Sequence, residues 1–173
     1  GSHLVDQIRC WLGEFQHVSA ALPTVADRID AAEDSFVVRA TLAGGVEGVL
    51  HQTAASWIPR PMGVTAVAGT MGTLTTDGNR VTLSDRDGER TLVVDDDLRL
   101  PNAAESDDPR QRFTHLELGP YTRLCEALRD RGKSTVPVPT FADGVAAMEV
   151  LDAIRVSAQL GGAQVPVAHQ TEP

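Results

Sequence analysis

Lysine is almost absent from this sequence, since Lys133 is the only one, and acidic residues outnumber basic ones. The net charge of -9 and the pI near 4.9 argue against nucleic acid as a partner, which requires clustered Lys and Arg to displace counterions. No apolar run approaches the roughly 20 residues that span a bilayer. We therefore expect a soluble protein with neither a nucleic-acid nor a membrane partner.

Several motifs that carry chemistry are also missing. No G-x-G spacing occurs, so neither the dinucleotide fingerprint nor the Walker phosphate loop is present. The histidines show no H-E-x-x-H pairing, the cysteines have no zinc spacing, and no G-x-S-x-G frames a nucleophilic serine. The chain alone is thus predicted to bind neither a nucleotide nor a metal, and hydrolase chemistry has no support.

Cysteine is scarce, and both copies, Cys10 and Cys125, stand among apolar residues in helical patterns. Such positions are typical of small buried thiols. We interpret the two as reduced core residues of a cytoplasmic protein. The amino terminus does not resemble a signal peptide, because Asp6 and Arg9 interrupt any apolar stretch there.

The sequence does contain a long succession of strand patterns. Short β-branched runs separated by Gly, Asp and Asn predict strands at 15–22, 36–42, 46–56, 63–68, 72–75, 80–84 and 90–94. The glycine-rich segment Gly69–Leu74 lies between two of them. Since no helix follows it, we interpret it as a turn rather than as a phosphate cradle.

Helical patterns flank the strands. A short amphipathic helix is predicted at the amino terminus from Leu4, Ile8, Trp11 and Leu12, ended by Gly13 as a left-handed C-cap. A second helix, with Pro120 in its first turn, carries one apolar face of Leu118, Tyr121, Leu124, Cys125 and Leu128.

A third helix runs from about Phe141 to Gln159 and is opened by a capping box of Thr140 and Asp143. Its apolar stripe consists of Ala147, Val150, Leu151, Ile154 and Ala158. Residues 163–167 predict a closing strand. Residues 95–112 are rich in Asp and Pro, so we expect an exposed connection there, and residues 168–173 form a loose tail.

This order of elements predicts the α+β class. We expect one domain over 1–167, built as an open, mixed but mostly antiparallel sheet of about six strands with helices on one face. Residues 46–55 carry apolar side chains on both sides of the strand alternation. The other face of the sheet is therefore predicted to be free for a second copy of the chain.

Two histidines are candidates for chemistry. His51 lies inside a strand pattern, where a structural role outweighs a role in a pocket. His3 precedes Asp6 by three residues on nearly the same helix face, a setting that suits proton transfer. Gly1-Ser2-His3 is also a common remnant of expression vectors, so two origins of His3 stay open.

Four segments together resemble the carboxy-terminal domain of the glucose–fructose oxidoreductase/inositol dehydrogenase (Gfo/Idh/MocA) family. They are residues 1–14, the strand 46–50, the turn 69–74, and 139–144 leading into the last helix. Each is weak alone, but they occur in the family's order along nearly the whole chain.

The resemblance implies an NAD(P)-dependent oxidoreductase that transfers a hydride to or from a sugar, cyclitol or related polyol. An amino-terminal Rossmann domain, absent from this chain, would bind NAD or NADP. The present domain would contribute to the substrate site and form a homodimer or homotetramer through its sheet face. By itself it would bind no cofactor and be inactive.

The resemblance also implies a catalytic residue. In the family an Asp-x-Gly-x-His segment opens this domain, and Gly1 and His3 match its last part, which makes His3 the proton relay. Lys133 does not match the catalytic lysine of the family. Two alternatives remain: a stand-alone ligand-binding or oligomerisation module of the same fold, and a lyase or isomerase that uses His3 without a nucleotide.

Overall fold

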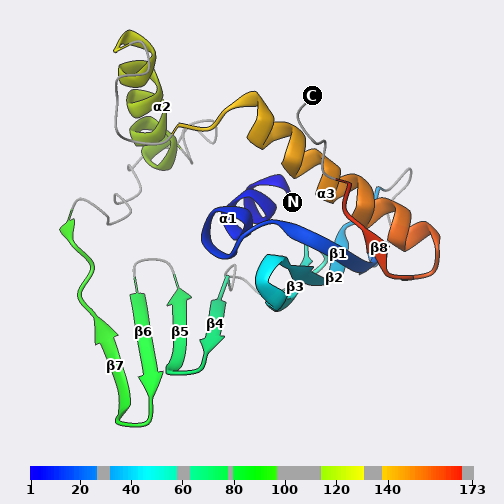
Figure 1. Ribbon diagram of the computed structural model, residues 1–173, viewed down its shortest axis with the longest axis horizontal. Coiled ribbons are helices and arrows are strands. Elements are labelled where there is room, and N and C mark those ends of the chain that lie inside the picture. The colour runs from blue at the N-terminus through cyan, green and yellow to red at the C-terminus, as the bar shows by residue number, and fades with distance from the viewer. Residues whose placement is uncertain (27–31, 58–62, 78–79, 97–113, 131–137, 169–173) are drawn as a thin grey trace. The chain divides into compact units, whose positions relative to one another are not determined.

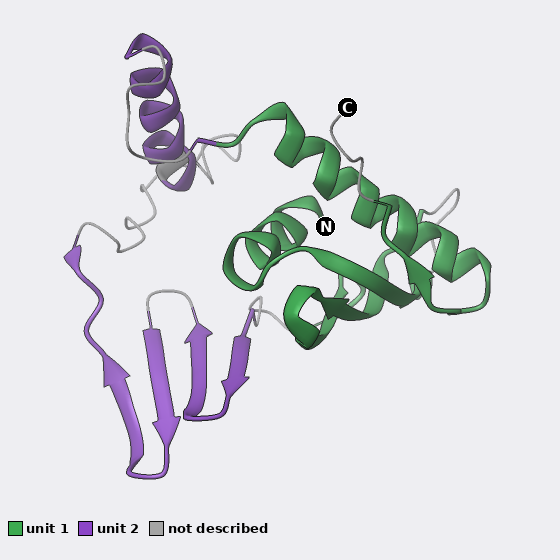
Figure 2. Ribbon diagram, in the orientation of Figure 1, with its two compact units in different colours: residues 1–57, 139–173 green, residues 58–138 purple. Residues whose placement is uncertain are grey.

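The computed structural model describes residues 1–26, 32–57, 63–77, 80–96, 114–130 and 138–168. The chain divides into two compact units, one formed by residues 1–57 and 139–173 and the other by residues 58–138 (Figure 2). The first unit is therefore assembled from both ends of the chain. Whether the two units form one domain over 1–167 stays a prediction.

Unit 1 is a four-stranded antiparallel sheet with two helices (Figure 1). Its strands are β1 (Phe15–Ala21), β2 (Ser35–Leu42), β3 (Glu47–Thr53) and the short β8 (Val165–Pro166), in the order β3-β2-β1-β8. A short 3-10 turn, Ala43–Gly45, joins β2 to β3. The helices are α1 (Ser2–Leu12) and α3 (Phe141–Gln159).

Alternation of side chains along the strands separates the two faces of this sheet. The inner face presents Val18, Val38 and Leu50, which are buried together with Val5 of α1 and Val150 of α3. The outer face is open, since Val49 is 73% exposed. The expected placement of helices on one face is thus confirmed for α1 and α3.

Helix α3 is fixed to the edge of the sheet by a hydroxyl group. Ser157 is completely buried, and its Oγ accepts a hydrogen bond from Ala20 N at 2.8 Å and donates one to Ala163 O at 2.6 Å. The side chain therefore joins the end of β1 to the segment that leads into β8. The amphipathic pattern of the sequence identified only apolar positions of this helix, so it did not predict the role of Ser157.

Arg9 fastens α1 to its surroundings. Its guanidinium forms two hydrogen bonds of 2.7 Å with Glu14, contacts Asp6 at 3.4 Å, and donates to Asp143 O at 3.0 Å. The side chain is only 9% exposed, and the hydrogen bond with Glu14 raises the pKa of Arg9. Gly13 then ends α1 with the expected positive φ, 97°, but its ψ of -179° differs from the left-handed C-cap that the sequence predicts.

The predicted capping box opens α3. Asp143 N donates to Thr140 Oγ1 at 3.3 Å, while Thr140 N donates to Asp143 Oδ2 at 2.7 Å. The hydroxyl group of Thr140 donates a further hydrogen bond to Asp143 Oδ2, also at 2.7 Å. This bond, the one from Thr140 N and the charge of Arg9 hold the pKa of Asp143 below its ordinary value. The same carboxylate group thus serves the helix start and lies next to the Arg9 cluster.

Unit 2 contains a second four-stranded antiparallel sheet and one helix. The strands β4 (Thr65–Gly69), β5 (Gly72–Asp77), β6 (Arg80–Asp85) and β7 (Gly88–Leu92) follow one another in sequence order. The predicted turn between β4 and β5 is confirmed. A Cβ atom at Gly72 would lie 2.7 Å from Ser84 O, which explains why a glycine stands there.

The α+β class with antiparallel strands is confirmed, but the strands lie in two sheets of four rather than in one sheet of about six. Strand runs in the sequence indicate where strands occur. They do not indicate which edges pair, because backbone hydrogen bonds are the same for every residue. The strand runs thus predicted the antiparallel class, and the structure adds that the described strands pair as two sheets, one in each unit.

Helix α2 (Thr114–Arg129) also differs from its prediction. Pro120 lies inside the helix and not in its first turn, so the carbonyl of Leu116 loses an intrahelical partner. The expected apolar face is largely exposed, with Tyr121 at 62% and Leu128 at 70%. None of the helices in the described ranges is long and apolar enough to cross a membrane.

Both cysteines are free but exposed, so their predicted burial was wrong. In α1 the inward residues include Ile8, and Cys10 follows it by a rotation of about 200° around the helix. Cys10 therefore points away from the core. The predicted connection 95–112 and the tail 168–173 fall almost entirely outside the described residues.

Replacing Ser157 by alanine should destabilise unit 1 by about 1–3 kcal/mol, because Ala20 N–H and the Ala163 carbonyl lose a buried partner. Urea unfolding followed by circular dichroism measures this change. Ser19→Ala, in the same strand as Ala20 but only partly buried, is the control and should cost well under 1 kcal/mol. Equal losses of stability in both variants would contradict the role assigned to the Ser157 hydroxyl group.

The capping box should weaken in acid. Because the folded state lowers the pKa of Asp143, its contribution is fully present above the ordinary carboxyl range, about pH 4, and is lost as pH falls further. The free energy of unfolding of Asp143→Asn, measured from pH 6 to 3, should lie about 1 kcal/mol or less below that of the parent at pH 6. As pH falls towards 3, the free energies of unfolding of the variant and the parent should approach each other.

Asp130→Asn supplies the control for this titration, because it removes an exposed carboxylate after α2, remote from the capping box in sequence. Its difference from the parent should be near zero at both ends of the pH range. A stability gap for Asp143→Asn that stays constant down to pH 3 would show that the carboxylate charge contributes nothing.

Candidate functional site

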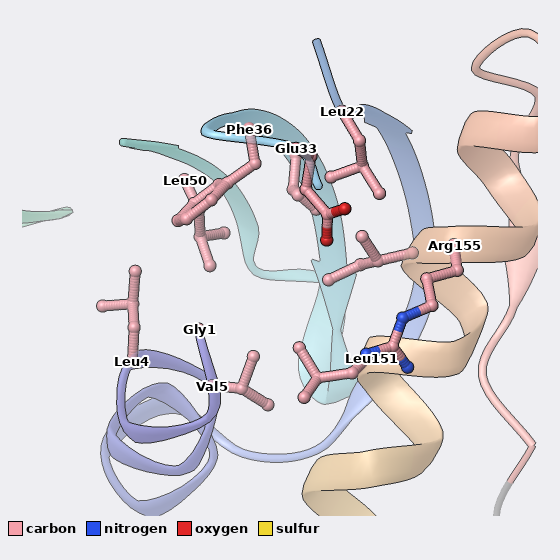
Figure 3. Close-up of a pocket in the computed structure, with 11 residues that line it drawn as sticks. Gly1, Leu4, Val5, Leu22, Glu33, Phe36, Leu50, Leu151 and Arg155 are labelled. Carbon is pink, nitrogen blue, oxygen red and sulfur yellow. The ribbon is translucent and has the colours of Figure 1, made fainter. Parts of the chain in front are cut away.

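Unit 1 contains a pocket between its helices and the inner face of its sheet (Figure 3). Its volume is about 110 Å³. Most of the residues that line it are apolar, and they come from α1, the strands, α3 and the β1–β2 connection. The lining residues are Gly1, Leu4, Val5, Leu22, Glu33, Phe36, Val38, Leu50, Leu151, Ile154 and Arg155. The walls are thus almost entirely apolar.

Two charged side chains break the apolar lining. Figure 3 shows Glu33, which precedes β2, with its carboxylate directed into the pocket, and Arg155 of α3 extending beside Leu151. Arg155 Nη1 donates to Asp152 Oδ1 at 2.7 Å. Within the described part of the chain, no hydrogen bond or ion pair joins Glu33 to Arg155. The pocket therefore has one anionic and one cationic neighbour that are not neutralised by each other.

The structure places His3 in the first turn of α1, outside this pocket. His3 is exposed, whereas the next two residues, Leu4 and Val5, line the pocket. The carboxylate of Asp6, which the sequence placed beside His3, contacts Arg9 at 3.4 Å. The imidazole is consequently accessible to a molecule held outside unit 1.

The two histidines on the described strands, His51 and His17, do not line the pocket. His51 is exposed on β3, next to the inward Leu50, so its side chain points to the outer face of the sheet. His17 lies on β1 and does not line the pocket. The position of Lys133 is outside the described residues.

The described residues do not fit a dinucleotide. A dinucleotide cradle requires a parallel strand that enters a helix through a glycine-rich turn. The strand pairs seen here are antiparallel, and the turn at Gly69–Gly72 joins two strands. Among these residues, no group of three or more His, Cys, Asp and Glu side chains is arranged to hold a metal ion.

Sequence reasoning did not single out Glu33 or Arg155. Neither belongs to a recognisable motif, and they lie more than a hundred positions apart in the chain. The amphipathic pattern of α3 did mark Leu151 and Ile154 as inward, so it located one wall of the pocket. Only the packing of α3 on the sheet brings Arg155 to the pocket that Glu33 also lines.

Comparison with known proteins gives the family context. Residues 1–75 match the GFO/IDH/MocA C-terminal domain. Among curated proteins, none matches the chain significantly. The family match therefore covers α1, the sheet of unit 1 except β8, and in unit 2 the strand β4 with most of β5.

Solved structures resemble the chain over nearly its whole length. An oxidoreductase from Agrobacterium radiobacter, in complex with NAD+, L-tartaric acid and magnesium, matches with a TM-score of 0.76 at 19% identity. A levoglucosan dehydrogenase with NADH and levoglucosan has a TM-score of 0.74 at 21% identity. The WlbA dehydrogenase from Bordetella pertussis, with NADH and UDP-GlcNAcA, has a TM-score of 0.67 at 23% identity.

These matches cover 96%, 97% and 96% of this chain, but only 47%, 49% and 46% of the respective relatives. The chain thus spans about half the length of the oxidoreductases that it resembles. At these identities the likeness establishes the fold. Together with the sequence match over residues 1–75, it confirms that the chain resembles the GFO/IDH/MocA C-terminal domain.

Proposed function

We propose that this chain is the substrate-side and assembly domain of an NAD(P)-dependent oxidoreductase that acts on a sugar, a cyclitol or a related polyol. The observation that carries the proposal is the fold, which dehydrogenases with nicotinamide cofactors share over 96–97% of the chain. The names of those relatives include sugars and a hydroxy acid as ligands. A further domain of the parent protein would bind NAD or NADP.

His3 would act as the proton relay of that enzyme. Its place in the first turn of α1 leaves the imidazole exposed, so a substrate bound beside α1 by a second domain can reach it. The Arg9 cluster supports this role, because it fixes the helix that carries His3 to Glu14 and to the start of α3. The chain alone lacks a dinucleotide cradle in its described part and is expected to be inactive.

The outer face of the sheet in unit 1 would pair two copies of the protein. Val37 and Val49 are 43% and 73% exposed on this face, and the neighbouring Arg39 and Glu47 bind each other at 3.2 Å. Exposed valines flanked by charged residues are typical of surfaces that associate. We place the protein in the cytoplasm, which accords with its two free cysteines.

A stand-alone module of the same fold, without redox chemistry, was the alternative. No specific observation favours it, since the named relatives are oxidoreductases and dehydrogenases. The coding sequence immediately before Gly1 decides between the two. An aspartate two residues before Gly1, preceded by a strand, G-x-G-x-x-G and a helix, supports the oxidoreductase; unrelated coding sequence removes the redox assignment.

In the full-length protein, His3→Ala should lower kcat for polyol oxidation with NAD+ or NADP+ by about 100-fold or more, because proton transfer loses its relay. The pH profile of kcat should lose one ionisation at the same time. Cys10→Ala, an exposed change on the same helix, serves as the control and should leave kcat within twofold of the parent. Unchanged kcat and an unchanged pH profile in His3→Ala would contradict the assigned role.

Val49→Asp should convert the dimer or tetramer of the chain to monomers, because it places two carboxylates in the paired sheet face. Sedimentation velocity measures the change. Val93→Asp, which alters a valine that is 88% exposed in unit 2, should leave the subunit number unaltered. A parent chain that is itself monomeric would contradict this part of the proposal.

A further inference from the structure

The apolar pocket of unit 1 is unsuited to a polyol. Apart from Glu33 and Arg155, its walls are formed by aliphatic side chains and Phe36, which offer no hydrogen-bond partner to the several hydroxyl groups of a polyol. Each hydroxyl group buried there without a partner would lose its hydrogen bonds with water and gain none in return. The pocket is therefore distinct in chemistry from a sugar site, and a ligand for it must present an apolar body.

The charges at the pocket define the rest of the ligand. Glu33 and Arg155 come from different elements and reach the same apolar space without pairing with each other, as far as the described residues show. Both side chains are exposed to solvent, so neither is forced to lose its charge. A molecule that carries both a positive and a negative group would satisfy both side chains at once.

The guanidinium group of Arg155 has N–H donors besides the one that contacts Asp152. Arg155 uses Nη1 in its contact with Asp152, and this contact lies between side chains that are 51% and 69% exposed, where ion pairs contribute little. Its remaining N–H groups can bind a carboxylate in the planar, bidentate manner that arginine favours. The Glu33 carboxylate in turn can accept hydrogen bonds from an ammonium group.

The size of the pocket limits the apolar body. An apolar cavity of about 150 Å³ accommodates benzene, and the volume here is about 110 Å³. A branched aliphatic side chain such as that of valine or leucine matches this space, whereas an indole ring is too large. Leu4, Leu50 and Leu151 would surround it with aliphatic contacts.

We propose that this pocket binds a small apolar α-amino acid, with its ammonium group on Glu33, its carboxylate on Arg155 and its aliphatic side chain among the leucines of α1, β3 and α3. Such a ligand would link the connection before β2 to both helices. It would therefore stabilise unit 1 by a free energy that rises with the logarithm of the ligand concentration once that concentration exceeds the Kd. This site requires neither a nucleotide nor a redox step, so it stands independently of the oxidoreductase assignment.

Isothermal titration of the full chain with L-leucine tests the proposal. We expect saturable binding with a Kd of about 1 mM or tighter, and a rise in the thermal midpoint. 4-Methylpentanoate, which lacks the ammonium group, and isopentylamine, which lacks the carboxylate, should each bind at least about tenfold more weakly. No saturable heat at about 10 mM L-leucine, or equal binding of leucine and 4-methylpentanoate, would overturn the proposal.

Matched variants test whether the charges of Glu33 and Arg155 contribute to leucine binding. Glu33→Gln and Arg155→Gln alter exposed side chains, so both should fold, and each should weaken leucine binding about tenfold or more. Glu47→Gln and Arg39→Gln make the same changes in the ion pair on the outer face of the same sheet, and should leave the Kd of leucine within twofold. An equal loss in the outer-face variants would show that leucine does not bind in this pocket.

Discussion

The contact between α3 and the inner face of the β3-β2-β1-β8 sheet holds unit 1 together. Val150 and Ser157 of this helix are fully buried, and they represent the two kinds of interaction involved. Val150 contributes apolar burial with Val18 and Val38 in the common core, while Ser157 satisfies a backbone donor at the end of β1 and a carbonyl before β8. Since α3 follows unit 2 in the chain, this contact also joins the two separate segments of sequence that make up unit 1.

The Arg9 cluster extends this arrangement to the amino terminus. It joins α1 to Glu14 at the start of the sheet and to Asp143 in the first turn of α3. Because most of this side chain is withdrawn from solvent, its charge is compensated by close carboxylates rather than by water. The position of α1 then determines two features: the exposure of His3, and one wall of the apolar pocket.

The two candidate sites differ in the physics that would make them work. His3 lies on the exposed side of α1, where a reacting group must come from outside the unit. The pocket lies on the inward side, where most of the lining side chains are aliphatic and two charged ones, Glu33 and Arg155, join them. One short helix thus separates a polar, accessible surface from an apolar enclosure, which follows from its amphipathic sequence.

Much of the fold could be predicted, because it depends on neighbours in the sequence. The helix Phe141–Gln159, its Thr140–Asp143 capping box and the Gly13 cap are all decided within a few residues. Strand positions follow in the same way from β-branched runs between glycine turns. The predicted burial of Cys10 failed because an apolar neighbourhood in sequence does not fix which side of a helix faces the core.

The sequence by itself therefore determined the α+β class, the bounds of most elements and the family resemblance, since these rest on local propensity and on ordered motifs. The tertiary structure alone decided that the strands divide into two sheets, that Ser157 bridges β1 and β8, and that Glu33 and Arg155 line one pocket. The physical reason is the same in each case: pairing and packing join residues distant in the chain, through groups that leave no periodic pattern in the sequence.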